Sequence, residues 1–338
     1  MNVLVTGGAG YIGSILSRLL LKEGYNVTVL DRLFFGKDST KDIEDQITLI
    51  KDDIRFFDPE HLNGIDSVFD LAALSNDPCG ELDPEKTMDI NYKGRVRVAN
   101  LAKKHGIKKY VFASTCSVYG FQDGFINEES TLNPLTTYAK ASVMAEKEIL
   151  PLVDKNFSAT VLRQATVYGL SHRMRFDLAI NGMTLGYFKN GKIPIMRDGT
   201  QWRPFVNVND TSLAFIKVLE AEPELVSGQI FNVGCDEQNV QIFDLAKMVA
   251  EACDLPFEYE WYGDCDTRSY RVSFSKIRDT LNYVPQTSIK QGAKNVFDAL
   301  SEGKLNPDDP RMITVKWYKH ILEMQKFLKD TEIDGALL

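Results

Sequence analysis

Short apolar runs alternate with stretches of helical periodicity along the first half of the chain. Runs rich in valine, leucine and isoleucine predict strands, and apolar residues spaced three and four apart predict helices. The expected strands cover residues 2–6, 26–31, 47–51, 67–71, 110–113 and 159–163, and the expected helices cover residues 11–23, 85–105 and 138–150. Regular alternation of strand and helix is typical of a parallel sheet with helices on both faces. The pattern therefore predicts an α/β fold with a doubly wound parallel sheet.

The pattern becomes looser after residue 169, where loops with glycine, proline and arginine separate helices such as the one expected over 242–252. We therefore expect two units, a first one over residues 1–169 and a smaller α/β unit over residues 170–330. An apolar run over 229–233 is expected to return to the first sheet as a further strand.

The charge balance limits the classes of partner. The 338 residues include 39 lysines and arginines against 47 aspartates and glutamates, which gives a net charge of −8. An acidic chain has no general attraction for phosphate backbones, so nucleic acid is not an expected partner. No stretch of about 18 apolar residues predicts a membrane span, and we expect no membrane partner.

The cysteine and histidine patterns argue against a metal site. The five cysteines are odd in number and form no CxxC pair, and the four histidines are scattered along the chain. Such usage does not fit a zinc site or a disulfide framework. No metal is expected, and with no secretory signal pattern at the start of the chain the expected location is the reducing cytoplasm.

Three glycines, Gly7, Gly10 and Gly13, lie between the first expected strand and the first expected helix. Glycines at this spacing allow a tight turn, close approach of the backbone to a pyrophosphate, and close packing of the helix on the strand. Asp31 ends the second expected strand, where a carboxylate accepts two hydrogen bonds from an adenosine ribose diol and repels a 2′-phosphate. This favours NAD over NADP, although the neighbouring Arg32 could accommodate such a phosphate. Asp53 and Ile54 are placed to reach the adenine.

The chain resembles a known family through a series of motifs. In order they are TGGAGYIG from Thr6, Asp31, Asp53-Ile54, Leu71-Ala72-Ala73, Asn91-Tyr92-Lys93-Gly94, STCSVYG from Ser114, RPFVNVND from Arg203, and Asp266-Thr267-Arg268. Together they resemble the extended short-chain dehydrogenase/reductase family, in its branch of nucleotide-sugar epimerases and dehydratases (UDP-galactose 4-epimerase-like). The resemblance implies a Rossmann domain with bound NAD, a smaller domain for a nucleotide-diphosphate sugar, and a homodimer built from the helices over 85–105 and 138–150. It also assigns cofactor contacts to Tyr11, Ile12, Leu71, Ala72, Ala73 and Asn91.

The resemblance assigns the chemistry to a hydroxyl and a tyrosine. Thr115 matches the residue that hydrogen-bonds the sugar oxygen, and Tyr138 matches the general base. The family has a lysine four residues after the tyrosine, but this chain has Ser142 there. A free tyrosine has a pKa of about 10 and is about one part in a thousand ionised at pH 7, so the cation matters. Lys140 points elsewhere on a helix. The sequence leaves three alternatives open: another cation acts on Tyr138, the enzyme is slow or catalytically silent, or position 142 has been altered. If the cation is missing, Ser142→Lys should accelerate hydride transfer by about tenfold.

The residues after Thr115 narrow the reaction. Cys116 and Ser117 supply no carboxylate of the kind that dehydratases of the family place there. The simplest remaining chemistry is hydride removal at sugar C4, which gives a 4-epimerase if the hydride returns to the other face. A 4-keto sugar product and a non-catalytic NAD- and nucleotide-sugar-binding protein remain alternatives.

The substrate contacts come from the second half of the chain. Arg203 and Arg268 match the family's diphosphate-binding arginines, and the planar guanidinium suits phosphate oxygens. Ser117 and Asn181 are further expected substrate contacts. Asp70 is unusual, because the family more often has histidine before the Leu71-Ala72-Ala73 motif.

Overall fold

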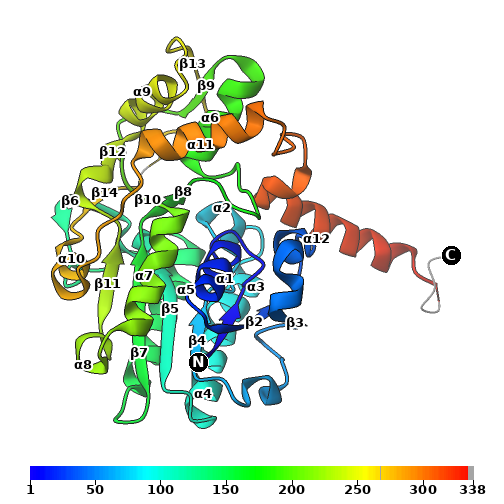
Figure 1. Cartoon of the computed structure of the whole chain (residues 1–338). Helices are drawn as coiled ribbons and strands as arrows, with labels where there is room; N and C mark the ends of the chain where they lie inside the picture. The colour runs from blue at the N-terminus through cyan, green and yellow to red at the C-terminus, as the bar shows by residue number, and fades with distance from the viewer. Residues whose placement is uncertain (267, 334–338) are drawn as a thin grey trace.

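The computed structural model describes residues 1–266 and 268–333, so Thr267 of the last motif lies outside the described residues. One seven-stranded sheet forms the centre of the molecule, with strand order β11-β7-β5-β4-β1-β2-β3 (Figure 1). Every pairing within it is parallel. The strands are β1 (Asn2–Thr6), β2 (Asn26–Asp31), β3 (Ile47–Lys51), β4 (Ser67–Asp70), β5 (Lys109–Thr115), β7 (Ser158–Gln164) and β11 (Ile230–Val233). The doubly wound α/β fold is confirmed.

Alternate residues of β1 face the two helical layers that cover the sheet. Val3 and Val5 belong to a buried core formed with α1 and α7, whereas Leu4 belongs to a second core formed with α4 and α5. These helices are α1 (Gly13–Lys22), α7 (Val208–Glu220), α4 (Arg95–Lys104) and α5 (Thr137–Ile149). Because successive side chains of a strand point to opposite faces, a run of apolar residues is the sequence that a sheet covered on both sides requires.

A smaller group of elements packs around a third core at the upper end of the sheet in Figure 1. Its members are β8 (Thr166–Tyr168), β9 (Ile193–Met196), β10 (Trp202–Asn207), β12 (Asn239–Gln241), β13 (Tyr259–Tyr262), α6 (Ala179–Asn190), α9 (Ile242–Ala252) and α11 (Ile289–Ser301). They form a three-stranded sheet, β12-β10-β8, and a two-stranded sheet, β13-β9. From the same part of the sequence, β11 pairs with β7, so the large sheet includes a strand from beyond residue 169.

The single long helix expected over 85–105 is wrong in detail. The structure has α3 (Pro84–Met88), then a wide π turn over Asp89–Gly94, and then α4. Periodicity of apolar residues does not reveal such a turn, because the chain direction is retained through it. The wide turn places Asn91 beside the loop that follows β4, where its side chain holds Leu74.

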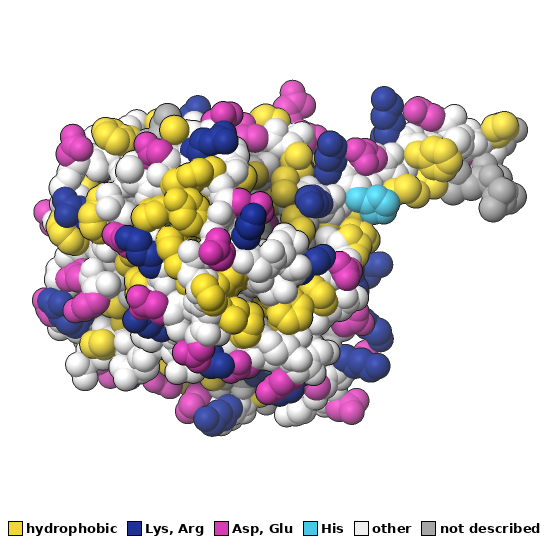
Figure 2. All heavy atoms as spheres, turned by 90° about the horizontal axis from the view of Figure 1, so that it is seen from above, with side chains coloured by type: hydrophobic (Ala, Val, Ile, Leu, Met, Phe, Trp, Pro, Cys, Tyr) yellow, Lys and Arg dark blue, Asp and Glu magenta, His cyan; other side chains and the backbone are white. Residues whose placement is uncertain are grey.

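The remaining elements lie around the edges of the two groups. They are α2 (Asp77–Gly80), α8 (Pro223–Val226), α10 (Ser275–Leu281), α12 (Thr314–Thr331), and the two-stranded sheet of β6 (Phe121–Ile126) and β14 (Ser269–Val272). Figures 1 and 2 show α12 extending from the body, with its first turn against the main body. Among residues 1–266 and 268–333, no helix combines the length and the apolar character needed to cross a membrane.

Candidate active site

A cavity of about 290 Å³ opens at the carboxyl ends of the parallel strands. Ligands of open α/β sheets bind at this edge. Most of the residues predicted from the sequence line it: Gly7, Gly10, Tyr11, Ile12, Gly13, Asp31, Asp53, Ile54, Leu71, Ala72, Ala73, Thr115, Ser117 and Tyr138. Five do not line it, namely Asn91, Ser142, Asn181, Arg203 and Arg268.

The glycine turn after β1 has no room for side chains. Gly7 has φ of 68°, and a Cβ there would lie 2.9 Å from backbone atoms of Ala72. A Cβ on Gly13 would lie 2.3 Å from the carbonyl oxygen of Gly7. The turn leads directly into α1. Among the described residues, the N–H groups of Tyr11, Ile12 and Gly13 donate to no backbone carbonyl oxygen, whereas Ser14 N–H already donates to Gly10. These are the features of a backbone cradle for a pyrophosphate.

Asp31 and Asp53 both line the cavity, but their carboxylates have different electrostatic surroundings. The Asp31 carboxylate accepts hydrogen bonds from the backbone N–H groups of Ala9 and Leu33, while its burial raises its pKa. Burial acts on Asp53 in the same direction, but hydrogen bonds from Arg55 and Arg32 outweigh it and lower the Asp53 pKa to about 2. Arg32, which also lines the cavity, is thus paired with Asp53 in this structure.

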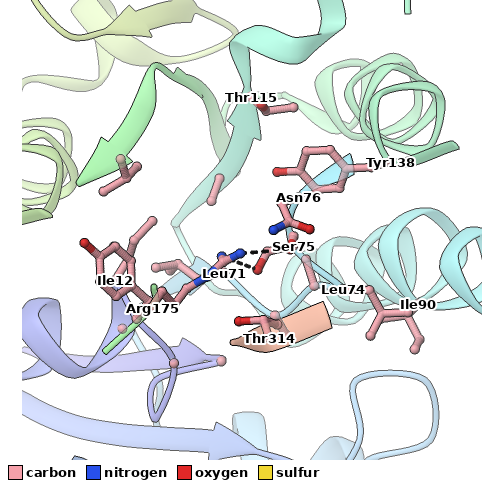
Figure 3. Close-up of a pocket in the computed structure, with 18 of the residues that line it drawn as sticks. Ile12, Leu71, Leu74, Ser75, Asn76, Ile90, Thr115, Tyr138, Arg175 and Thr314 are labelled. Atoms are coloured by element: carbon pink, nitrogen blue, oxygen red, sulfur yellow. Dashed lines mark hydrogen bonds between the residues drawn. The ribbon is translucent and has the colours of Figure 1, made fainter. Parts of the chain in front are cut away.

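Thr115 and Tyr138 face the cavity from neighbouring elements (Figure 3). Thr115 ends β5, and its Oγ1 accepts a hydrogen bond from the N–H of Ser117 at 3.1 Å, which leaves the hydroxyl proton to be donated to Tyr138 or to a ligand. Tyr138 lies in the first turn of α5, which Thr136 caps by accepting from Ala139 N–H. The structure thus brings the two residues that the resemblance assigns to the chemistry to one cavity.

The charges around Tyr138 act in opposite directions on its phenol. Burial raises the pKa of Tyr138, and the carboxylate of Asp77 raises it further. Arg95, a hydrogen bond with Thr115, and Arg175 lower it. The net direction is upward, so the chain alone holds Tyr138 protonated at neutral pH.

Cys116 is not available for acid or base chemistry. Its side chain is 1% exposed, its thiol donates to the carbonyl oxygen of Arg163, and burial raises its pKa. The thiol is therefore a small buried group. Ser117, in contrast, lines the cavity as expected.

Asn91 and Asn181 support the cavity from behind. Asn91 accepts from Leu74 N–H at 2.8 Å and donates to Leu74 C=O at 3.0 Å, which fixes one cavity-lining residue through its backbone. Asn181 is fully buried; its amide donates to Tyr11 Oη and to the Arg175 carbonyl oxygen, and its oxygen accepts from Gly169 N–H. All the polar groups of Asn181 are therefore in use within the protein, and the structure does not bring it to a ligand.

Arg203 and Arg268 meet at a shared carboxylate beside the cavity. Each places an Nη2 atom 2.7 Å from Oδ2 of Asp266, and Arg268 also pairs with Asp77, which lines the cavity. Although burial opposes it, the two guanidinium groups hold the pKa of Asp266 below its usual value. The structure thus brings the two predicted arginines together, at one end of the cavity and behind its wall.

Two further arginines lie in the cavity wall itself. Arg175 pairs with Asp177 and donates to the Ser75 hydroxyl, as Figure 3 shows for the contact with Ser75. The Arg173 guanidinium lies 3.5 Å from the centre of the Phe35 ring and donates to Thr314, and among the described residues it forms no ion pair. Burial lowers the pKa of Arg173 to about 10, helped by the like charge of Arg175.

The sequence as a whole matches one family model. Residues 3–234 match the description "NAD dependent epimerase/dehydratase family". The chain belongs to this family. It is similar to a UDP-glucose 4-epimerase of Lactobacillus helveticus, with 31% identity over 85% of this chain and 92% of that protein. It is also similar to a UDP-glucuronate 4-epimerase of Thermodesulfobacterium geofontis (strain OPF15), with 27% identity over 96% of this chain and 98% of that protein.

The fold agrees with solved members of the epimerase/dehydratase family. The crystal structure of a UDP-glucuronic acid 4-epimerase from Bacillus cereus in complex with UDP-glucuronic acid and NAD has a TM-score of 0.79. The two chains are 26% identical, and the match covers 89% of this chain and 99% of that one. The protein is therefore an NAD-dependent enzyme of the epimerase/dehydratase family. The glycine cradle and Asp31 fit NAD. The cradle excludes any side chain, and each Asp31 oxygen accepts one backbone N–H and retains a further lone pair at the cavity for a ribose diol.

This epimerase/dehydratase member has no lysine beside its tyrosine, and neither of the residues considered from the sequence replaces it. Ser142 is 1% exposed, and its hydroxyl donates to the carbonyl oxygen of Tyr138 one turn back at 3.0 Å. Lys140 is exposed and does not line the cavity. The cation that reaches the cavity near Tyr138 from the neighbouring helix is Arg95, which the sequence analysis missed.

Arg95 could have been found from the register of its helix. The buried positions of α4 are residues 95, 98, 99 and 102, which is one face at helical spacing. An arginine on an otherwise apolar stripe needs a buried partner, and Asp70, the other unusual residue, supplies it.

Proposed function

We propose that this enzyme is an NAD-dependent 4-epimerase of a UDP-sugar. One observation carries the proposal: Thr115 and Tyr138 face the same cavity as the glycine cradle, while positions 116 and 117 provide no carboxylate. The names of its relatives support the choice of a UDP-sugar and of position 4. Epimerisation at C4 needs no protein carboxylate beside the neighbouring ring carbons, whereas a dehydratase would need one there to move a proton.

In the proposed mechanism, Thr115 donates a hydrogen bond to the 4-oxygen of the sugar and holds it near Tyr138. In its ionised form, the Tyr138 oxygen takes the proton of the 4-hydroxyl as the C4–H bond breaks and a C4=O bond forms. NAD, when bound, supplies the acceptor for the hydride. With NAD bound, the hydride would return to the opposite face of C4 once the 4-keto sugar has rotated in the cavity, and Tyr138 would give the proton back. Substrate and product therefore differ only in configuration at C4.

The test is incubation of the purified enzyme with UDP-glucose, UDP-galactose and the corresponding uronic acids, followed by proton NMR of the sugar. We expect interconversion of one C4 pair, with no net consumption of NAD. Tyr138→Phe should abolish it while leaving NAD bound. Accumulation of a 4-keto sugar would instead favour the dehydrogenase alternative. Binding of NAD and UDP-sugar without turnover of any of the four substrates would favour a non-catalytic binder.

For the diphosphate we propose Arg203 and Arg268. Both are already paired with carboxylates, and Asp77 and Asp266 bring the charge of the four-residue cluster to zero. A diphosphate would have to compete with these carboxylates, so we expect the arginines to change partners when substrate binds. The proposal also assigns residues 170–330 to nucleotide-sugar binding and residues 1–169 to NAD.

We infer a homodimer in which α4 and α5 of each subunit form the contact. The two helices pack beside each other on the same face of the sheet, and Met144 of α5 is 38% exposed there. Light scattering should give twice the mass of the chain, and Met144→Glu should shift it toward the monomer. The cysteines are unpaired, which fits the reducing cytoplasm that we propose as its location.

A further inference from the structure

A buried arginine enters the cavity from the helix next to Tyr138. Arg95 is 2% exposed and lies at the start of α4, yet it is one of the residues that line the cavity. Its guanidinium packs over the ring of Phe112, 3.9 Å from the ring centre. A charged group at such a depth is costly unless it is paired and hydrogen-bonded, so its presence requires a compensating site.

The compensating site is built at the ends of β4 and β5. Nη2 of Arg95 donates to the carbonyl oxygen of Ala113 at 2.8 Å and to that of Asp70, and Nε lies 3.4 Å from the Asp70 carboxylate. Asp70 is fully buried and also accepts from Thr6 Oγ1 at 2.6 Å and from Tyr110 Oη. The carboxylate is therefore itself held in place, and it fixes the guanidinium from one side.

One nitrogen of the guanidinium remains available. Within the described residues, Nη1 of Arg95 takes part in no hydrogen bond, and it is not among the buried polar atoms that lack a partner. Its two N–H groups are thus not sealed in the protein interior. Because the other nitrogens are held by β4 and β5, Nη1 is the part of Arg95 that can donate to a ligand in the cavity.

We propose that Arg95, positioned by Asp70, replaces the family's lysine: its Nη1 holds the nicotinamide ribose and its charge favours the ionised form of Tyr138. The inference rests on the proposed function for the role of Tyr138. Three unusual residues then have one explanation, because the lysine is absent at 142, a cation enters from 95, and an acid stands at 70 to hold it. Guanidinium is suited to the task, since its planar fork donates in parallel to paired oxygens such as those of a ribose diol.

The electrostatic surroundings agree with this assignment. Four groups act on Tyr138 from the elements around it: Asp77 raises its pKa, and Arg95, Thr115 and Arg175 lower it. Arg175 is already paired with Asp177 on the opposite wall. Arg95 is likewise paired, with Asp70, but of these two cations it lowers the Tyr138 pKa more, so its removal should affect Tyr138 most.

The experiment compares three variants. They are Arg95→Gln, the relocated-charge variant Arg95→Gln/Ser142→Lys, in which the positive charge moves from position 95 to position 142, and the control Lys140→Gln. The first readout is the Kd for NAD by calorimetry, and the second is the pKa of Tyr138 from tyrosinate absorbance, taken as the difference against Tyr138→Phe. The third is the pH profile of substrate turnover. The first two readouts do not depend on turnover, so they test Arg95 even if the proposed reaction is wrong.

We expect Arg95→Gln to weaken NAD binding by about tenfold and to raise the Tyr138 pKa by about one unit, so that turnover falls most at low pH. The relocated-charge variant should recover most of the NAD affinity and most of the change in the Tyr138 pKa, because it places an ammonium at the position where the family has lysine. Lys140→Gln should match the unmodified enzyme. If Arg95→Gln does not fold, Asp70→Asn/Arg95→Gln removes both buried charges. This double variant should still bind NAD about tenfold more weakly, whereas its two opposite effects on the Tyr138 pKa should largely cancel. Unchanged NAD affinity and an unchanged Tyr138 pKa in either folded variant would overturn the proposal.

Discussion

Ser142→Lys puts back the lysine that the family carries, and the structure predicts that this change alone harms the enzyme. From the sequence, the same substitution should accelerate hydride transfer by about tenfold. The structure changes that expectation, because Ser142 is 1% exposed and a cation already reaches the cavity from Arg95. The new ammonium would enter a closed space that already contains a positive charge.

The magnitude follows from the charges involved. Two unit charges about 4–8 Å apart repel by about 2–4 kcal/mol at an effective dielectric constant of about 20. Overpacking of a buried position adds about 1–3 kcal/mol. The lost hydrogen bond from Ser142 to the Tyr138 carbonyl oxygen adds little, since that oxygen is a helix acceptor. We therefore expect Ser142→Lys to lower the free energy of unfolding by about 3 kcal/mol or more and to bring no gain in rate.

A double-mutant cycle isolates the repulsion between the two cations. Denaturant unfolding of the unmodified enzyme, Ser142→Lys, Arg95→Gln and the double variant gives the coupling free energy. Without the arginine, the lysine should cost about 2 kcal/mol less than it does beside it. The reasoning would be refuted if the changes in unfolding free energy of Ser142→Lys and Arg95→Gln were additive within about 0.5 kcal/mol. It would also be refuted if Ser142→Lys had normal stability and a tenfold higher rate. Either result would show that the two cations do not occupy neighbouring positions at the cavity.

Four other substitutions test the rest of the site. Asp31→Ala should remove a preference for NAD over NADP that we expect to be at least about tenfold in Kd, measured by calorimetry with both cofactors; equal affinities in the unmodified enzyme would contradict the role of Asp31. Arg203→Ala or Arg268→Ala should weaken UDP-sugar binding by about 1.5–3 kcal/mol and leave NAD binding unchanged, and unaltered sugar-nucleotide affinity in both would refute their assignment. Asp70→Asn should lower the free energy of unfolding by about 3–5 kcal/mol, because it removes the counter-charge of a buried arginine. It should also move the pH profile of turnover to lower pH, since loss of a negative charge favours ionised Tyr138; a shift to higher pH would contradict this.

The large sheet could be predicted from the sequence because its determinants are local. Buried parallel strands consist of short apolar runs, and the three with unchanged bounds, β1, β2 and β3, are separated by clear helices or turns. The glycine turn and Asp31 could be predicted for the same reason, since they adjoin β1 and β2 along the chain. The broken helix before α4 could not, because a wide π turn leaves the apolar periodicity nearly intact.

The supporting residues of the site were harder to assign because their roles depend on groups far away in the chain. Asn181 has a residue type and a place in the sequence suited to a ligand contact, but Tyr11, Gly169 and Arg175 take up its whole amide. Arg203 and Arg268 were both assigned to a diphosphate from the sequence, but the group that joins them in the structure is the carboxylate of Asp266. Local motifs identify a polar residue, and only the folded chain shows what satisfies it.

The same reasoning explains why a missing lysine does not imply a missing function. In the proposed arrangement a lysine on α5 is exchanged for an arginine on α4, and the arginine requires Asp70 because it leaves the backbone at a buried position. A flexible lysine would reach the ribose from the tyrosine's own helix, whereas Arg95 is fixed by two strand ends before any ligand arrives. The cation is then held in advance, so less side-chain entropy is lost when NAD binds. Asp70 also has a cost, because its negative charge weakens the effect of the Arg95 charge on the Tyr138 pKa. The gain in NAD binding offsets part of that cost. The roles of Arg95 and Asp70 can therefore be separated only by varying both residues.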